Sequence, residues 1–134
     1  MPSLFSKIIQ GEIPCHKIAE NDEFLAFLDI MPLEKGHTLV VPKKEIDYIF
    51  DLDDEMLSKM HIFSKKVAKA IKSAVPCLRV GVAVIGLEVP HAHIHLVPLH
   101  NLASLTFTKE RVKLSQVEFE EIAKVIRNNF DLGN

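Results

Sequence analysis

The chain has 134 residues, of which 48% are hydrophobic and 25% are charged, and its net charge is -2 with histidine neutral. This composition is typical of one globular domain with a buried core, and indicates neither a disordered chain nor a membrane protein. Binding to a nucleic acid polymer relies on a basic surface, so the small net charge favours a small, locally held phosphate ligand.

The two cysteines, Cys15 and Cys77, lie far apart in the chain and form no CxxC motif. Neither a disulfide framework nor a cysteine-rich zinc site is therefore expected. The N-terminal segment lacks the apolar run of a signal peptide, and no stretch reaches the length of a membrane span. We expect a cytoplasmic protein with no membrane partner.

Hydrophobic periodicity and turn residues predict helices and strands in a mixed order along the chain. The expected elements are a short helix over residues 4–9, an extended run from residue 18, strands over 24–29 and 37–42, a helix from 51 or 53 to 71, strands over 80–84 and 91–98, and a helix over about 115–130. Gly86 is the expected turning point between the last two strands, which we expect to pair antiparallel.

Three histidines, His91, His93 and His95, alternate with apolar residues. If this run is extended, the three imidazoles share one face of the sheet and the intervening side chains face the other. Three histidines on one face are unusual for a solvated strand. We therefore expect a site that uses neutral imidazole near pH 7.

Three kinds of chemistry fit this pattern. The first is a metal site, in which His37, Asp29 or Glu88 adds a ligand to the strand histidines. The second is covalent phosphoryl or nucleotidyl transfer, in which one imidazole attacks phosphorus while the others stabilise phosphoryl oxygens and protonate the leaving group. The third is binding of phosphate by imidazolium groups without catalysis.

The whole arrangement resembles the histidine triad (HIT) family of nucleotide hydrolases and transferases, which is named for a His-x-His-x-His run with apolar residues between. Residues 91–97 match that run position by position. Three upstream segments agree with the family in order and spacing, namely residues 4–14, 26–30 and 36–43. The resemblance covers residues 4 to about 98.

The resemblance implies that His93 is the nucleophile, which forms a phosphohistidine intermediate at the α-phosphorus of a nucleoside 5'-phosphate derivative such as a phosphoramidate, an anhydride or a dinucleotide. It gives supporting roles to His91, His95 and His37, with the main-chain carbonyl of His91 holding the central ring. Asp29 is expected to bind ribose hydroxyls. The base pocket, expected to take a purine, corresponds to Leu4, Phe5, Ile8, Phe27 and Ile30.

The turn before the triad departs from the family pattern. Leu87 stands where glutamine is usual, and Glu88 brings a carboxylate to the phosphate-contacting part of the substrate site. The alternative function is therefore a nucleotide-binding protein with little or no catalysis. The places of a structural zinc found in some members hold Ser3, Ser6 and Glu45, so neither a metal nor a cofactor is expected.

We therefore expect an α+β protein with a HIT-like fold, in which a roughly five-stranded antiparallel sheet carries a long helix, a short N-terminal helix and a C-terminal helix. Residues 1–134 are expected to form one domain, with a triad core over about 4–98 and a C-terminal extension whose helix spans about 115–130. The resemblance also implies a homodimer through the long helix and the strand before the triad.

Overall fold

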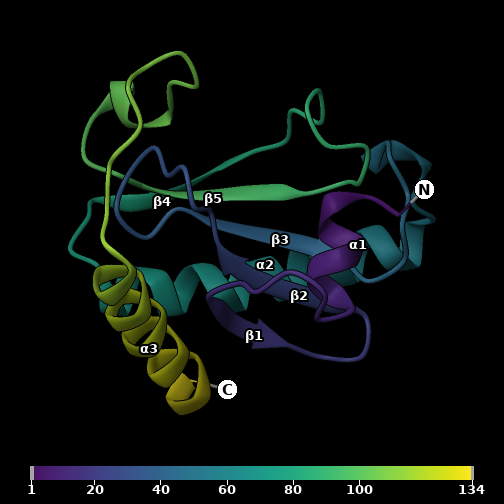
Figure 1. Ribbon diagram of the computed structural model, residues 1–134, viewed down its shortest axis with the longest axis horizontal. Coiled ribbons are helices and arrows are strands. Elements are labelled where there is room, and N and C mark those ends of the chain that lie inside the picture. The colour runs from purple at the N-terminus through teal and green to yellow at the C-terminus, as the bar shows by residue number, and fades with distance from the viewer. Residues whose placement is uncertain (1, 134) are drawn as a thin grey trace.

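The computed structural model describes residues 2–133. It contains one five-stranded antiparallel sheet with helices on both faces (Figure 1). The strands are β1 Lys17–Glu20, β2 Phe24–Leu28, β3 Thr38–Pro42, β4 Arg79–Ala83 and β5 Ile94–Leu99, in the order β1-β2-β3-β5-β4. The helices are α1 Leu4–Ile9, α2 Asp54–Ala74 and α3 Gln116–Gly133, with 3-10 turns η1 Ile49–Asp51 and η2 Leu102–Leu105. The predicted α+β class and five-stranded antiparallel sheet are confirmed.

Helix α2 begins and ends where its sequence favours it. The Asp53 carboxylate accepts a hydrogen bond from the Met56 amide at 2.8 Å, which caps the first turn. Acidic residues occupy that turn and Lys72 lies in the last turn, as the helix dipole favours. No helix within residues 2–133 combines the length and apolar character needed to cross a membrane.

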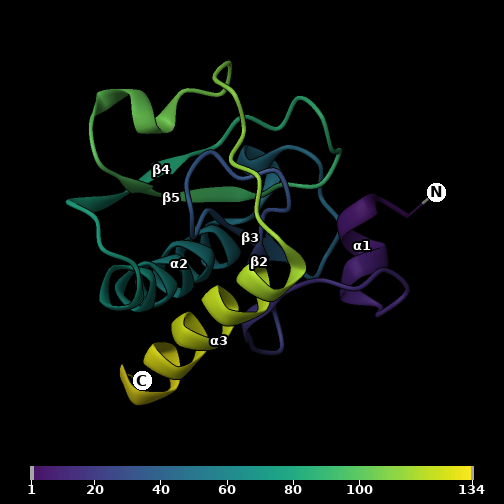
Figure 2. The same cartoon turned by 60° about the vertical axis from the view of Figure 1, so that its left-hand side comes forward.

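The two faces of the sheet are buried against different helices. On one face, Val40 and Ile94 join the apolar stripes of α2 and α3 in the main core. On the other face, Phe27 and Leu39 pack with Phe5 of α1 in a smaller cluster. Figure 2 shows α2 and α3 side by side, with β2 and β3 between them and α1. The strand alternation therefore separates the main core from the α1 face.

The histidine strand is shorter than predicted at its start. Strand β5 begins at Ile94, so His91 and His93 lie in the segment just before it. The expected alternation nevertheless holds, because Ala92 and Ile94 belong to the main core while the histidine rings face the other way. The predicted antiparallel pairing of β4 and β5 is confirmed, with Gly86 at a φ of +73° in the turn between them.

The segment between β5 and α3, for which the sequence predicts no element, crosses the loop between β2 and β3. The Val112 amide donates to the Pro32 carbonyl at 2.9 Å. The Lys109 ammonium pairs with the Glu34 carboxylate. These contacts fix residues 107–112 against the loop that leads to His37.

A positive φ and close neighbours make Gly36, directly before His37, hard to replace. A Cβ added at Gly36, where φ is +97°, would lie 3.1 Å from Val75 Cγ2. At Gly11, where φ is +83°, an added Cβ would meet no atom within 4 Å. We expect Gly36→Ala to lower the free energy of unfolding by about 2–5 kcal/mol, because backbone strain and overpacking both act.

The matched variant Gly11→Ala carries the backbone strain alone, so we expect a loss of about 1–2 kcal/mol. Urea denaturation of the two variants and the unmodified chain measures both losses. Equal losses would show that the contact with Val75 does not constrain the start of β3.

Candidate active site

Four aromatic rings form a row on the α1 face of the sheet. The ring centroids of Phe5 and His93 are 5.0 Å apart, those of His93 and His95 are 4.9 Å apart, and those of His95 and Phe107 are 4.8 Å apart. Each pair has a tilted, edge-to-face geometry, which is the favoured arrangement for such rings. The two phenylalanines thus bracket two of the triad histidines.

One hydrogen bond determines which nitrogen of the central ring is reactive. His93 Nδ1 lies 2.7 Å from the main-chain carbonyl oxygen of His91. A carbonyl oxygen only accepts, so Nδ1 must carry the hydrogen and donate it. In the neutral ring the lone pair therefore lies on Nε2. That lone pair makes Nε2 of His93 a nucleophile.

The His91 ring is held at both of its nitrogens. Nε2 donates to the main-chain carbonyl oxygen of Pro42 at 2.7 Å, so Nδ1 is the acceptor in the neutral ring. The Ser3 hydroxyl donates to that Nδ1 at 2.7 Å. His91 is fully buried, and burial lowers its pKa, so the neutral form with both nitrogens paired is favoured.

Glu45 ties the start of α1 to this arrangement. Its Oε1 accepts from the Ser3 amide and from the Ser6 hydroxyl, each at 2.6 Å, and the Ser6 amide donates to Ser3 Oγ at 3.0 Å. The Ser6 hydroxyl and the Ser3 amide lower the pKa of Glu45 to about 2. Ser3, Ser6 and Glu45, which stand where some family members have zinc ligands, are therefore linked to His91 by hydrogen bonds.

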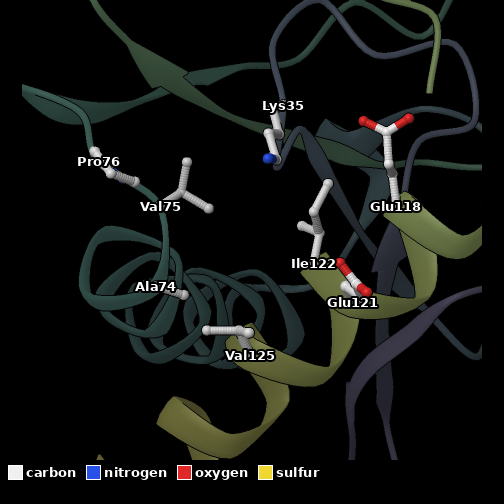
Figure 3. A pocket seen from close by; sticks show the side chains of 8 residues that line it. All are labelled: Lys35, Ala74, Val75, Pro76, Glu118, Glu121, Ile122 and Val125. Atoms are coloured by element: carbon white, nitrogen blue, oxygen red, sulfur yellow. The ribbon is translucent and has the colours of Figure 1, made fainter. Parts of the chain in front are cut away.

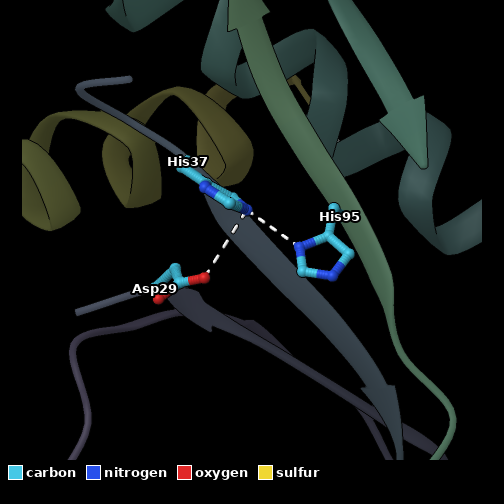
Figure 4. Close-up of side chains that lie close together, drawn as sticks. All are labelled: Asp29, His37 and His95. Carbon is cyan, nitrogen blue, oxygen red and sulfur yellow. Dashed lines mark hydrogen bonds and ion pairs between the residues drawn. The ribbon is translucent and has the colours of Figure 1, made fainter. Parts of the chain in front are cut away.

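A second chain of hydrogen bonds orients His95 through His37 (Figure 4). The Leu33 amide donates to His37 Nδ1 at 3.0 Å, so the hydrogen of the neutral His37 ring lies on Nε2. His37 Nε2 lies 2.9 Å from His95 Nδ1 and donates to it. His95 must then carry its own hydrogen on Nε2. These two hydrogen bonds, which we call the His37–His95 relay, therefore leave Nε2 of His95 with an N–H donor rather than a lone pair.

His37 and His95 are both neutral near pH 7, because their pKa values are lowered. Burial, together with the nearby charges of other histidines and Arg111, lowers the pKa of His37 to about 3 and that of His95 to about 4. Near pH 7 both rings are therefore uncharged. His95 is suited to donating a hydrogen bond to an anionic oxygen, and less suited to giving up a proton.

Asp29 lies directly after β2 and contacts the same cluster. Its Oδ1 accepts from the Met31 amide at 2.8 Å, and its Oδ2 lies 3.6 Å from His37 Nε2. Burial raises the pKa of Asp29, and the charge of Glu88 adds to that rise. Glu88 itself is exposed, as is Leu87, on the turn before the triad.

One group of side chains could approach a single cation. Ligand atoms of Asp29, His37 and His95 all lie within 4.8 Å of one another. A metal needs a nitrogen lone pair, but Nε2 of His37 carries a hydrogen, and Nδ1 of His95 accepts that hydrogen. The hydrogen-bond pattern therefore favours a relay between the rings over the metal site that the sequence left open.

The apolar residues expected to form a base pocket are brought together only in part. Phe5 and Phe27 lie in one cluster with Ile8 at its edge. Leu4 and Ile30 lie outside that cluster and are exposed at 48% and 71%. Sequence reasoning missed the other members of the cluster, which are Ile9, Cys15, Leu25, Leu39, Val41 and Val89.

Two further residues beside the site were also missed. Phe107 lies against His95, and its ring centroid is 6.4 Å from that of His37. Arg111 places its guanidinium carbon 5.8 Å from the Phe107 ring centroid. No local pattern could have predicted either contact, because both arise where residues 107–112 cross the loop before His37.

A separate pocket of about 230 Å³ lies between the end of α2 and helix α3 (Figure 3). Its lining is mostly apolar, with Lys35, Glu118 and Glu121 among the charged residues. None of the histidines lines it. The histidine row, and not this pocket, is therefore the candidate active site.

Comparisons with known proteins show the family to which the chain belongs. The family model described as "HIT domain" matches residues 10–102. An uncharacterized HIT-like protein of Borreliella burgdorferi is 33% identical over 94% of this chain and 96% of its own length. An adenosine 5'-monophosphoramidase of Schizosaccharomyces pombe is 40% identical over 75% of this chain and 77% of its own length.

Solved structures show the same fold. A HIT-like protein from Bartonella henselae, described as involved in cell-cycle regulation, has a TM-score of 0.81 at 34% identity, covering 95% of both chains. A zinc-bound histidine triad family protein from Mycobacterium smegmatis has a TM-score of 0.83 at 28% identity, covering 96% of this chain and 93% of that one. This chain belongs to the HIT (histidine triad) family.

Proposed function

We propose that the chain hydrolyses or transfers a nucleoside 5'-phosphate derivative at its α-phosphorus, through a phosphohistidine formed on His93. The observation that carries this proposal is the hydrogen bond from His93 Nδ1 to the His91 carbonyl, since it leaves Nε2 free to attack. Support also comes from a relative named as an adenosine 5'-monophosphoramidase.

The first step of the proposed reaction uses the two free ring nitrogens. His93 Nε2 attacks the α-phosphorus, the new nitrogen–phosphorus bond forms, and the bond to the leaving group breaks. The leaving amine or oxygen takes a proton from solvent. His95 Nε2–H donates a hydrogen bond to a phosphoryl oxygen, because its lowered pKa suits it to this role better than to full proton transfer.

The second step releases the product. A water oxygen attacks phosphorus, the bond to His93 Nε2 breaks, and the water proton passes to solvent. Throughout, the His91 carbonyl stabilises the positive charge on the ring that follows attack, because it accepts the Nδ1 hydrogen. The relay through His37 keeps the His95 donor in place.

The apolar cluster and Asp29 suggest how the nucleoside is held. Phe5 packs edge-to-face on both His93 and Phe27, and an apolar, aromatic environment beside the nucleophile suits a purine base. Asp29 lies at the end of β2 within reach of the histidines, where its carboxylate can accept from ribose hydroxyls. We place the whole substrate along the row of rings.

The second candidate function is nucleotide binding with little or no turnover. It is favoured by Glu88, whose negative charge is close enough to raise the pKa of Asp29 and would also repel a phosphate. Leu87 beside it is 87% exposed, and its side chain offers no hydrogen-bond donor to a phosphoryl oxygen.

A fluorogenic adenosine phosphoramidate distinguishes the two functions. We expect His93→Ala to lose at least about a thousandfold in kcat/KM, because no other group supplies the attacking lone pair. His61→Ala, on the exposed face of α2, is the matched control and should keep full activity.

Calorimetry with adenosine monophosphate completes the test. A folded His93→Ala protein with unchanged turnover would contradict the nucleophile assignment. An unmodified chain that binds the nucleotide but cleaves no phosphoramidate or dinucleotide would favour the binding function.

We further propose a homodimer through α2 and β4, in the cytoplasm. Strand β4 is at an edge of the sheet, and Leu78, Val82 and Ile85 in and around it are exposed at 71%, 56% and 50%. Exposed apolar side chains beside an unpaired edge favour association with a second copy.

Analytical ultracentrifugation of the full chain tests the dimer. We expect twice the mass of one chain, and a shift to the single-chain mass in Val82→Glu, because a charge would be buried in the interface. A single-chain mass for the unmodified protein at micromolar concentration would contradict the proposal.

A further inference from the structure

The fixed charges around the histidine row present a problem for a phosphate substrate. His37, His91 and His95 all have lowered pKa values because they are buried, so none of them favours a positive charge near pH 7. Asp29 and Glu88 are two carboxylates beside these rings, and they are close enough that the charge of Glu88 raises the pKa of Asp29. Three neutral rings and two carboxylates offer no fixed positive charge, so a cation from elsewhere would help the site to attract an anionic substrate.

The cations that reach this site come from residues 107–112. Lys109 and Arg111 both contribute to the low pKa of His37, after the larger effect of burial. Lys109 is neutralised by its ion pair with Glu34. Among the residues described, Arg111 has no carboxylate within ion-pair distance, and its guanidinium donates instead to two main-chain carbonyl oxygens.

Arg111 is held in place on three sides. Its Nη1 donates to the Met31 carbonyl at 2.7 Å, two residues after Asp29. Its Nη2 donates to the Phe107 carbonyl at 3.4 Å, and the guanidinium lies by the Phe107 ring. Phe107 in turn packs edge-to-face on His95. The guanidinium is therefore anchored both to the loop that follows Asp29 and to Phe107, which packs on His95, and has limited freedom to move away.

The charge of Arg111 acts on three groups of the site. It contributes, after burial, to the low pKa of His37 and His95, and it opposes the rise that burial causes in the pKa of Asp29. Residues 107 and 111 lie beyond the segment 10–102 that the family model matches. The match to the family model therefore does not bear on these two residues.

We propose that Arg111, seated by Phe107, is a substrate-binding residue that supplies the fixed positive charge for the phosphate of the nucleotide. The inference rests on the proposed function and adds to it a specificity for the anionic part of the substrate. Because the guanidinium stays charged at all relevant pH values, this attraction does not depend on protonating a buried histidine.

Calorimetry with adenosine monophosphate and with adenosine isolates the phosphate contribution, because the two ligands share the base and the ribose. We expect Arg111→Gln to weaken binding of the monophosphate about tenfold, as for a charge acting across several ångströms of partly solvated protein, and to leave adenosine binding unchanged. Lys113→Gln removes the same charge from an exposed position two residues along and should change neither affinity.

A second variant separates charge from anchoring. Arg111→Lys keeps the charge but loses the fork that bridges Met31 and Phe107, so it should retain most of the preference for the monophosphate. The inference is overturned if Arg111→Gln keeps that preference, if Arg111→Lys loses as much as Arg111→Gln, or if Lys113→Gln loses as much. An unmodified chain that binds neither ligand would instead overturn the proposed function itself, and the inference with it.

Discussion

The chemistry of this site depends on a hydrogen bond from His93 Nδ1 to the main-chain carbonyl oxygen of His91. A carbonyl cannot change from acceptor to donor, so the tautomer of His93 does not depend on any side chain that could titrate. The relay through His37 begins in the same way, at the main-chain amide of Leu33. One main-chain acceptor and one main-chain donor thus give adjacent rings opposite properties, a free lone pair on His93 and a free N–H on His95.

The surrounding fold maintains these two main-chain groups. Pro42 and Ser3 hold the His91 ring from opposite sides, and Glu45 fastens Ser3 and the start of α1. Helix α1 therefore helps to position the triad histidines. It also carries Phe5, whose ring packs on His93. In this chain, hydrogen bonds between Ser3, Ser6, Glu45 and His91 connect the helix to the triad.

Much of this could be predicted from sequence because it is local. Alternation placed the triad histidines on one face. The helix expected from about residue 115 is also observed, and reciprocal hydrogen bonds between Ser115 and Glu118 cap the start of α3. What escaped prediction depends on contacts between distant residues. Ser3 pairs with Glu45, and Phe107 approaches His95, only because the packed sheet brings distant segments together. The exposure of Ile30 likewise depends on packing that the local sequence does not reveal.

The central claim concerns tautomers, and long-range ¹H–¹⁵N correlation spectra of the histidine side chains at neutral pH test it most directly. The account predicts that His93 carries its hydrogen on Nδ1, whereas His37, His91 and His95 carry theirs on Nε2. His93 protonated only at Nε2, or His95 protonated only at Nδ1, would contradict it, because the lone pair and the donor would then be exchanged between the two rings.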